Sequence, residues 1–162
     1  MLIAAAAVYG GGSYTALKRE QLNELDALCH TLRLMQDELE TRALPLPELA
    51  AQLDTRTENA GKALLSGLLR RLPELGSRDF QNIWEECVTE SVKHSEEAAR
   101  LLCTLGSFLG RYDVDSQLEA IRSCRETLEK LRTTAAEALP QTRRLGMGLA
   151  LTSGALIVIT LI

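Results

Sequence analysis

The sequence predicts an all-α protein, an antiparallel bundle of five to six helices with an apolar membrane segment at each end. Leu and Ala dominate its apolar content, whereas aromatic residues make up only 4%. Runs of β-branched residues are absent outside the C-terminal segment, and alternation at period two is hard to find, which argues against strands. All 18 basic and 22 acidic residues lie between Lys18 and Arg144. The chain therefore divides into residues 1–17, a charged body over 18–144, and residues 145–162.

Residues 145–162 are predicted to form a transmembrane helix. Eighteen residues at 1.5 Å each cover about 27 Å, close to the roughly 30 Å hydrocarbon core of a bilayer. The hydroxyl side chains Thr152, Ser153 and Thr160 can bond back to helix carbonyls. A buried core helix is the alternative, but the most apolar stretch ends the sequence without a polar cap.

Residues 1–17 form the weaker membrane segment, because their apolar run is short and contains Gly10, Gly11 and Gly12. Such glycines are better tolerated in membrane helices than in helices exposed to water. A signal peptide is the rival interpretation. A signal peptide would need a basic residue shortly after Met1, and this segment has none. We therefore expect an anchor.

The basic residues predict the orientation. Lys18 and Arg19 flank the first segment on its inner side, and Arg143 and Arg144 flank the second. No basic residue lies beyond either segment. The positive-inside rule therefore predicts that residues 18–144 face the cytoplasm and that both termini lie across the membrane.

The first helix of the body is expected to continue out of the N-terminal segment. Its apolar residues recur at intervals of three and four: Leu25, Leu28, Leu32, Met35 and Leu39. Its opposite face carries charged and polar residues: Glu24, Arg33, Gln36, Asp37 and Glu40. Pro45 and Pro47 end this helix, and Pro47 fits the first turn of the next one.

Further helices follow from similar signals. One ends at Pro73 and Gly76, the next is capped by Ser77 or Asp79, and another begins at Ser95. Their expected inward residues are Leu49, Ala50, Leu53, Ala60, Leu64, Leu65, Leu68, Leu69, Leu72, Phe80, Ile83, Trp84, Cys87, Val88, Ala98, Leu101, Leu102, Leu105, Phe108 and Leu109.

The longest helix starts at Asp113 or Asp115, after Gly110 has closed the preceding one as a C-terminal cap. We expect a kink or short break at Pro140, between this helix and the C-terminal segment. Its apolar stripe comprises Leu118, Ile121, Leu128, Leu131, Ala135 and Leu139.

No pattern in the sequence predicts an active site. His30 and His94 have no ligand neighbours at metal-binding spacing, and the four cysteines form no CxxC pair. Gly61-Lys62 lacks the first glycine of a Walker loop, because position 56 is Arg. Asp113-Val-Asp115 is better explained by helix capping than by metal binding. We predict no catalytic, metal or cofactor site, no nucleic acid and no small-molecule substrate.

Gly106 and Gly110 remain to be explained, because two glycines four apart share one helix face. Gly110 is explained by a cap, but Gly106 lies inside the predicted helix, where glycine costs about 1 kcal/mol relative to alanine. Either a core helix crosses at Gly106 or a partner docks there. We favour the internal crossing.

Three stretches of the chain carry a resemblance to a known family: LPLPELAAQLD (44–54), FQNIWEECV (80–88) and LCTLGSFLGRYDVDSQLEAI (102–121). With an apolar segment at each end, they resemble the stage III sporulation protein AB family. The most specific positions are Leu105, Gly106, Leu109, Gly110, Asp113 and Gln117, followed by the pair Phe80 and Trp84.

The resemblance implies a subunit of the channel complex that forms between the mother cell and the forespore. The family's helical domain is similar to the cytoplasmic domain of the type II secretion and type IV pilus platform proteins. The implied partners are other channel subunits and a cytosolic secretion-type ATPase, stage III sporulation protein AA. The implied location is the mother-cell membrane around the forespore. A non-catalytic, membrane-anchored adaptor or sensor unrelated to sporulation is the alternative.

Overall fold

A computed structural model describes the backbone of residues 2–110 and 113–160 and the side chains of residues 16–110 and 113–138. The described backbone is helical, as predicted, with six α-helices and one short 3-10 helix, η1. The elements are α1 (Leu2–Arg42), α2 (Leu46–Asp54), α3 (Asn59–Arg71), η1 (Leu72–Glu74), α4 (Phe80–Ser91), α5 (Glu96–Gly106) and α6 (Val114–Thr160).

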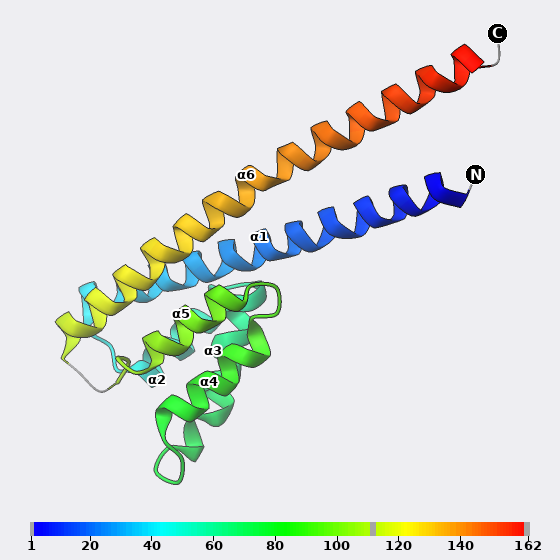
Figure 1. The fold of residues 1–162 in the computed structure, drawn as a ribbon. Coiled ribbons are helices and arrows are strands. Elements are labelled where there is room, and N and C mark those ends of the chain that lie inside the picture. Colours follow the sequence, from blue (N-terminus) through cyan, green and yellow to red (C-terminus); the bar gives the residue numbers. More distant parts are fainter. Residues whose placement is uncertain (1, 111–112, 161–162) are drawn as a thin grey trace.

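Two long helices form the frame of the fold. Helices α1 and α6 contain 41 and 47 residues and run antiparallel, so the two chain ends lie on the same side of the molecule (Figure 1). Three polar contacts tie them together: Asp26 pairs with Arg132, Gln36 Oε1 accepts a bond from Arg125 Nε at 3.3 Å, and Glu40 Oε1 lies 3.5 Å from Arg122 Nη2.

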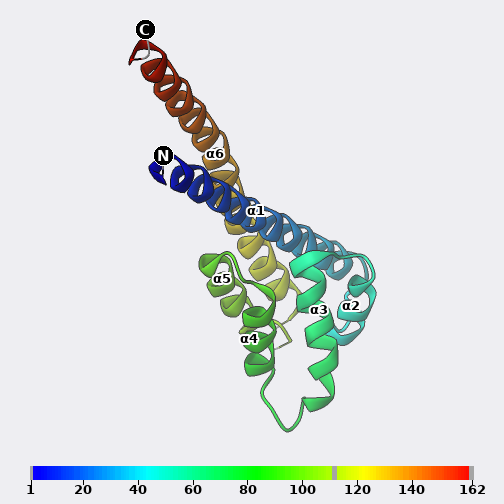
Figure 2. The ribbon, with the colours of Figure 1, turned by 90° about the vertical axis from the view of Figure 1, so that its right-hand side faces the viewer.

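Helices α2 to α5 pack on one side of this pair, against the half that lies away from the chain ends (Figures 1 and 2). The core is continuous, and the predicted stripe of α1 is buried along its whole length. Burying each of these large side chains contributes about 1.5–3 kcal/mol relative to leaving it exposed. Completely buried side chains include Leu25, Leu53, Leu68, Ile83, Trp84, Cys87, Val88, Ala98, Leu102, Ile121 and Leu128.

Most of the predicted helix boundaries are confirmed. Pro47 lies in the first turn of α2. The Ser95 hydroxyl accepts a bond from Ala98 N at 3.3 Å, so it caps α5 as predicted. Asp113 rather than Asp115 caps α6. Asp79 occupies the N-cap position of α4, although its side chain makes no capping bond.

Some predictions about individual residues are wrong. Helix α5 ends at Gly106, not at Gly110, because a turn over residues 107–110 follows it. Phe108 therefore lies outside the helix and is 39% exposed instead of facing inward. The short break that was one of the two alternatives predicted at Pro140 is absent, because α6 continues to Thr160. A proline within a helix removes one backbone hydrogen bond and crowds the preceding turn, but α6 stays helical across Pro140.

The polar face predicted for α1 also needs a correction. The helical period predicts that Glu24 shares that face with Arg33 and Asp37, but Glu24 is only 5% exposed. The α4–α5 turn covers it and supplies partners for its carboxylate. The sequence of α1 alone cannot reveal a turn that comes from a segment some seventy residues later.

Among the described residues, no helix is both long enough and apolar enough to cross a membrane. The two predicted membrane segments, residues 1–17 and 145–162, fall almost entirely outside the described side chains, which begin at residue 16 and end at residue 138.

Candidate functional site: the contacts of α5 with α4 and α6

The predicted motif residues gather around α5, and the first group joins α5 to α4. Trp84 of α4 is 0% exposed, and its Nε1 donates a hydrogen bond to Leu102 O of α5 at 2.6 Å. The rings of Phe80 and Trp84 stack with centroids 6.0 Å apart. A Cβ added to Gly106 would lie within 2.9 Å of three indole atoms of Trp84. Gly106 thus makes room for the indole, so the structure shows the internal-crossing alternative at this position.

The second group joins α5 to α6. Gly110 has φ +74°, a left-handed conformation that glycine adopts without steric penalty, and its N–H donates to Gln117 Oε1 at 3.3 Å. Asp113 Oδ1 accepts a bond from Ser116 N at 2.9 Å, and Asp113 Oδ2 accepts one from the Ser116 hydroxyl at 3.0 Å. These bonds favour the ionised carboxylate and lower the pKa of Asp113. The DxD pattern is therefore a helix cap.

Leu105 completes the motif from inside the core, where it is buried with Leu109. Each motif residue thus has a packing or capping role in the connection of α4, α5 and α6. Their side chains do not converge on a common point where a substrate could react.

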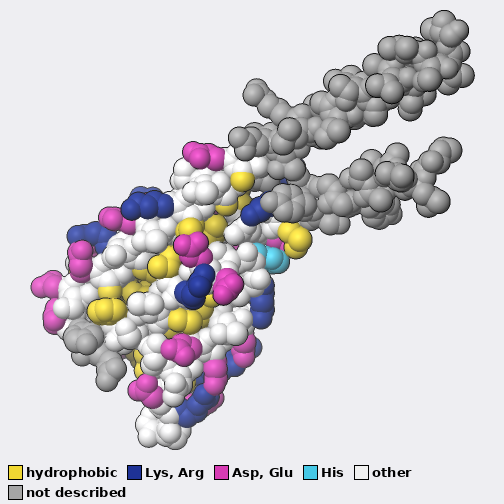
Figure 3. All heavy atoms as spheres, viewed as in Figure 1, with side chains coloured by type: hydrophobic (Ala, Val, Ile, Leu, Met, Phe, Trp, Pro, Cys, Tyr) yellow, Lys and Arg dark blue, Asp and Glu magenta, His cyan; other side chains and the backbone are white. Residues whose placement is uncertain are grey.

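An apolar groove lies between α5 and α6, with a volume of about 630 Å³. Figure 3 shows hydrophobic side chains along this seam of the surface. Its apolar lining comes from Leu101, Leu105, Phe108, Ala120 and Cys124. Four hydroxyl groups and one carboxylate line the rest: Thr104, Ser116, Ser123, Thr127 and Glu119. Sequence periodicity did not predict the groove, because it assigned Leu101 and Phe108 to the closed core.

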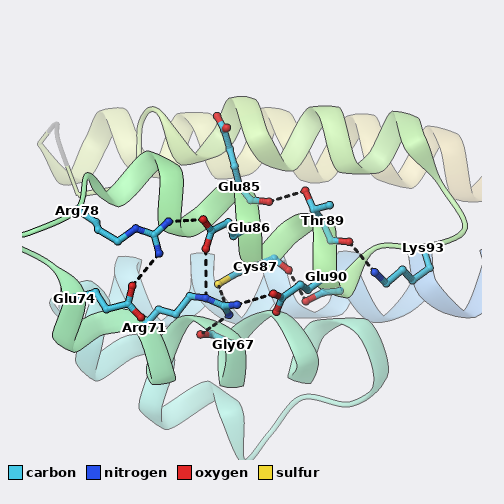
Figure 4. Close-up of polar contacts among 11 residues, drawn as sticks. Gly67, Arg71, Glu74, Arg78, Glu85, Glu86, Cys87, Thr89, Glu90 and Lys93 are labelled. Atoms are coloured by element: carbon cyan, nitrogen blue, oxygen red, sulfur yellow. Dashed lines mark hydrogen bonds and ion pairs between the residues drawn. The ribbon is translucent and has the colours of Figure 1, made fainter.

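A network of ion pairs covers the outer face of α3 and α4 (Figure 4). Arg71 Nη2 lies 2.6 Å from Glu90 Oε1, and Arg78 Nη1 lies 2.8 Å from Glu74 Oε2. Glu86 accepts a hydrogen bond from Arg78, which lowers its pKa, and its Oε2 forms an ion pair with Arg71 Nε at 3.6 Å. These groups are solvent-accessible, so each pair contributes little stability. The adjacent acids Glu85 and Glu86 are exposed surface residues.

Glu24 forms a polar contact that the sequence did not reveal. Its Oε2 accepts a bond from Lys93 N at 2.7 Å, and both carboxylate oxygens lie 3.1 Å from His94 N. Lys93 and His94 form the turn that precedes α5. The carboxylate satisfies two backbone N–H groups of the turn, just before the N-terminus of this helix, where a negative charge is favourable. This contact holds the α4–α5 turn against α1.

Most of the cysteines are buried, and both histidines are exposed. Cys29, Cys87 and Cys124 are buried free thiols, Cys103 is partly buried, and His30 and His94 are exposed. Burial raises the pKa of Cys29 to about 11 and that of Cys124 to about 12, which keeps both thiols protonated at neutral pH. Within the described part of the chain, no group of three or more His, Cys, Asp or Glu could hold a metal ion.

The described residues define a class of fold, a small all-α bundle supported by two long antiparallel helices. The chain belongs to the stage III sporulation protein AB family, which it matches over residues 1–162. A solved structure titled stage III sporulation protein AB (SpoIIIAB) superposes with a TM-score of 0.65 at 21% sequence identity. The alignment covers 75% of this chain and 97% of that one, and it supports a common fold. No curated protein matches the chain.

Proposed function

We propose that this protein is a membrane-anchored, non-catalytic subunit of the channel complex between mother cell and forespore. In this role it acts as a platform that docks a cytosolic secretion-type ATPase of the stage III sporulation protein AA type. The bundle faces the cytoplasm from the mother-cell membrane around the forespore. Family membership supports the link to sporulation. Among the described residues, the motif side chains are engaged in packing and capping rather than in a reactive cluster.

The pairing of α1 with α6 is the main observation in support of the proposed membrane anchoring. Leu17, the last residue of the N-terminal charge-free segment, lies twenty-three residues before Glu40 (40 − 17). Leu145, the first residue of the C-terminal one, lies twenty-three residues after Arg122 (145 − 122). Since Glu40 and Arg122 face each other across antiparallel helices, equal counts bring the two boundaries to one level.

A second ion pair, Asp26 with Arg132, gives nearly the same level for the two segment boundaries. Counted from Asp26 and Arg132, the boundaries lie nine and thirteen residues away, a difference of about one helical turn. An arginine side chain is long enough to account for much of this offset. Two charge-free segments that begin at one level and on one side are what a pair of anchors in one bilayer requires.

Alkaline carbonate extraction of membranes that contain the full chain tests the anchoring. We expect the chain to stay in the membrane fraction, and a reporter fused after Ile162 to be active only outside the cytoplasm. Release of the chain by carbonate would overturn the anchoring, and a cytoplasmic C-terminal reporter would overturn the orientation.

The α5–α6 groove is the surface that we propose for ATPase docking. Its lining on α6 extends from Ser116 to Thr127, which lie twenty-nine and eighteen residues before Leu145. At 1.5 Å per residue the groove spans levels about 27–44 Å from the boundary of the charge-free segment. A large cytosolic assembly can reach this level without touching the membrane. Buried apolar anchors in pockets supply most of the affinity of protein interfaces.

Pull-down of the purified ATPase by the full chain in detergent micelles tests the docking. Phe108 lies on the groove and is 39% exposed, and Leu75 lies between η1 and α4 and is 40% exposed. We expect Phe108→Glu to abolish capture and Leu75→Glu, its matched control, to leave capture unchanged. Loss of ATPase capture with Leu75→Glu but not with Phe108→Glu would assign the docking surface to the α3–α4 end instead. Failure of the unsubstituted chain to capture the ATPase would overturn the platform role.

A further inference from the structure

The α4–α5 turn lies close to the level at which α1 enters the proposed membrane. Glu24 holds the backbone of Lys93 and His94 against α1, and His94 Nε2 lies 3.7 Å from Glu20 Oε2. Glu20 is three residues beyond Leu17 and Glu24 is seven, which correspond to about 4.5 Å and about 10 Å along the helix. The turn is therefore within about 10 Å of the end of the charge-free segment.

A bilayer presents its headgroups at this level. The polar regions add about 10–15 Å to a hydrocarbon core of about 30 Å, or roughly 5–7 Å on each side. Lys93 is exposed, and its four-carbon stem spans roughly 6 Å. From a backbone held beside Glu24, its ammonium group can reach a lipid phosphate.

The charges around the turn are of both signs, so the donors of Lys93, and not the net charge, make the case for an anionic headgroup at this point. Lys93 Nζ donates one bond, to Thr89 O at 3.0 Å at the end of α4 (Figure 4), and an ammonium group has two further donors. The Glu24 carboxylate accepts bonds from two backbone N–H groups of the turn, and Glu20 faces His94. Lys18 and Arg19 add positive charge at the same level of α1. Glu96 and Glu97 lie in the first turn of α5, where their negative charges interact favourably with the helix dipole.

We infer that the α4–α5 turn is a second membrane contact, in which Lys93 binds the phosphate of anionic phospholipid headgroups. This inference rests on the anchoring proposed above. The contact fixes the rotation of the bundle about its two anchoring helices, because it presses the α4–α5 side toward the bilayer. One basic residue near an anionic surface contributes about 1 kcal/mol, or roughly five-fold in occupancy of the contact.

Fluorescence quenching in vesicles tests the inference. The full chain is reconstituted into phosphatidylcholine vesicles that contain phosphatidylglycerol and a lipid with a nitroxide on its headgroup. One reporter is a fluorophore on His94→Cys, and the control reporter is on Lys130→Cys, fifteen residues before Leu145 and so about 22 Å from the boundary. Both carry Cys103→Ser, because Cys103 is the one described native thiol that is partly exposed.

We expect strong quenching at position 94 and little at position 130. Lys93→Glu should reduce the quenched fraction at position 94 by about five-fold or more, and the matched reversal Lys130→Glu should not change it. Omission of phosphatidylglycerol should reduce the quenching at position 94 as well.

Equal quenching at positions 94 and 130, or no response to Lys93→Glu, in a chain that resists carbonate extraction would overturn this inference and leave the anchoring intact. A chain that carbonate releases would overturn both. Circular dichroism of each variant verifies that the bundle is folded before quenching is compared.

Discussion

The indole ring of Trp84 occupies the space in which a side chain at position 106 would stand. Three of its atoms lie within 2.9 Å of an added Cβ on Gly106, and its Nε1 binds Leu102 O one turn earlier on the same helix. The largest buried side chain of the bundle and the smallest residue of α5 thus fit each other. Both belong to the motif that carries the family resemblance.

Gly106→Ala should destabilise the protein by about 1–3 kcal/mol, because the added methyl group overpacks the site and outweighs the better helix propensity of alanine. Gly67→Ala is the matched control. Gly67 is a buried helical glycine of α3, but an added Cβ there would be 3.6 Å from Cys87 Sγ, an ordinary contact. We expect the control to be neutral or stabilising by up to about 1 kcal/mol. Urea unfolding of both variants measures the difference, and equal effects would contradict the role given to Trp84.

Gly61→Ala should destabilise the crossing of α3 with α1. An added Cβ would overlap Thr31 Oγ1 and lie 3.2 Å from Ala27 O, while the Thr31 hydroxyl donates to Ala27 O at 2.8 Å. We expect a loss of about 1–3 kcal/mol from overpacking. Thr31→Ala removes the overlapping hydroxyl, so the double variant should be more stable than the sum of the two single changes predicts. A double-mutant cycle of unfolding free energies measures this coupling, and strict additivity would contradict the contact.

Glu24→Ala should destabilise the protein by about 1–3 kcal/mol, because it leaves the N–H groups of Lys93 and His94 without their acceptor. Asp37→Ala on the exposed face of the same helix is the control, and it should change stability by less than about 0.5 kcal/mol. Hydrogen exchange of the Lys93 and His94 amides gives a second measurement. We expect faster exchange of these amides in Glu24→Ala, whereas unchanged exchange would argue against the contact.

Stability should fall as the pH rises from about 9 toward 11. Cys29 and Cys124 have a reference thiol pKa of 9.0 when unfolded, and burial raises the folded pKa values to about 11 and about 12. Below pH 9 the thiols are protonated in both states. Above pH 9 the unfolded chain loses these protons first, so deprotonation favours unfolding.

Urea unfolding at pH 8 and pH 10 under reducing conditions measures this dependence. The double variant Cys29→Ala/Cys124→Ala loses packing at both pH values, but its stability should fall less between them than that of the unsubstituted chain. The same fall in both proteins would assign the pH dependence to other groups.

Local sequence signals predicted most of the secondary structure. The proline pair before α2, the Ser95 cap and the Asp113 cap each act within four residues, so a reader of the sequence can recognise them. The wrong predictions concern residues whose environment depends on other segments of the chain. Phe108 follows the apolar period of α5 but lies in the turn after it, since the helix ends at Gly106.

The candidate site was predicted only in part for the same reason. The sequence singles out the motif residues as a candidate structural or interaction motif and favours a helix crossing at Gly106, but it does not predict that they lie together around α5. That Trp84 is the crossing group depends on the packing of α4 against α5. The groove between α5 and α6 depends on how far two helices separate, and no periodicity within either helix specifies that distance.

Helix period, helix capping and the cost of charge in lipid act on neighbouring residues, so the helical class, the order of the helices and the two charge-free ends can be read from the sequence. The packing of the helices was needed to show that Glu24 is buried beneath the α4–α5 turn and that Gly106 accommodates Trp84. It also pairs Glu40 with Arg122, from which Leu17 and Leu145 lie equal numbers of residues away. Each of these facts joins residues far apart in the chain, and such contacts form only when the helices pack.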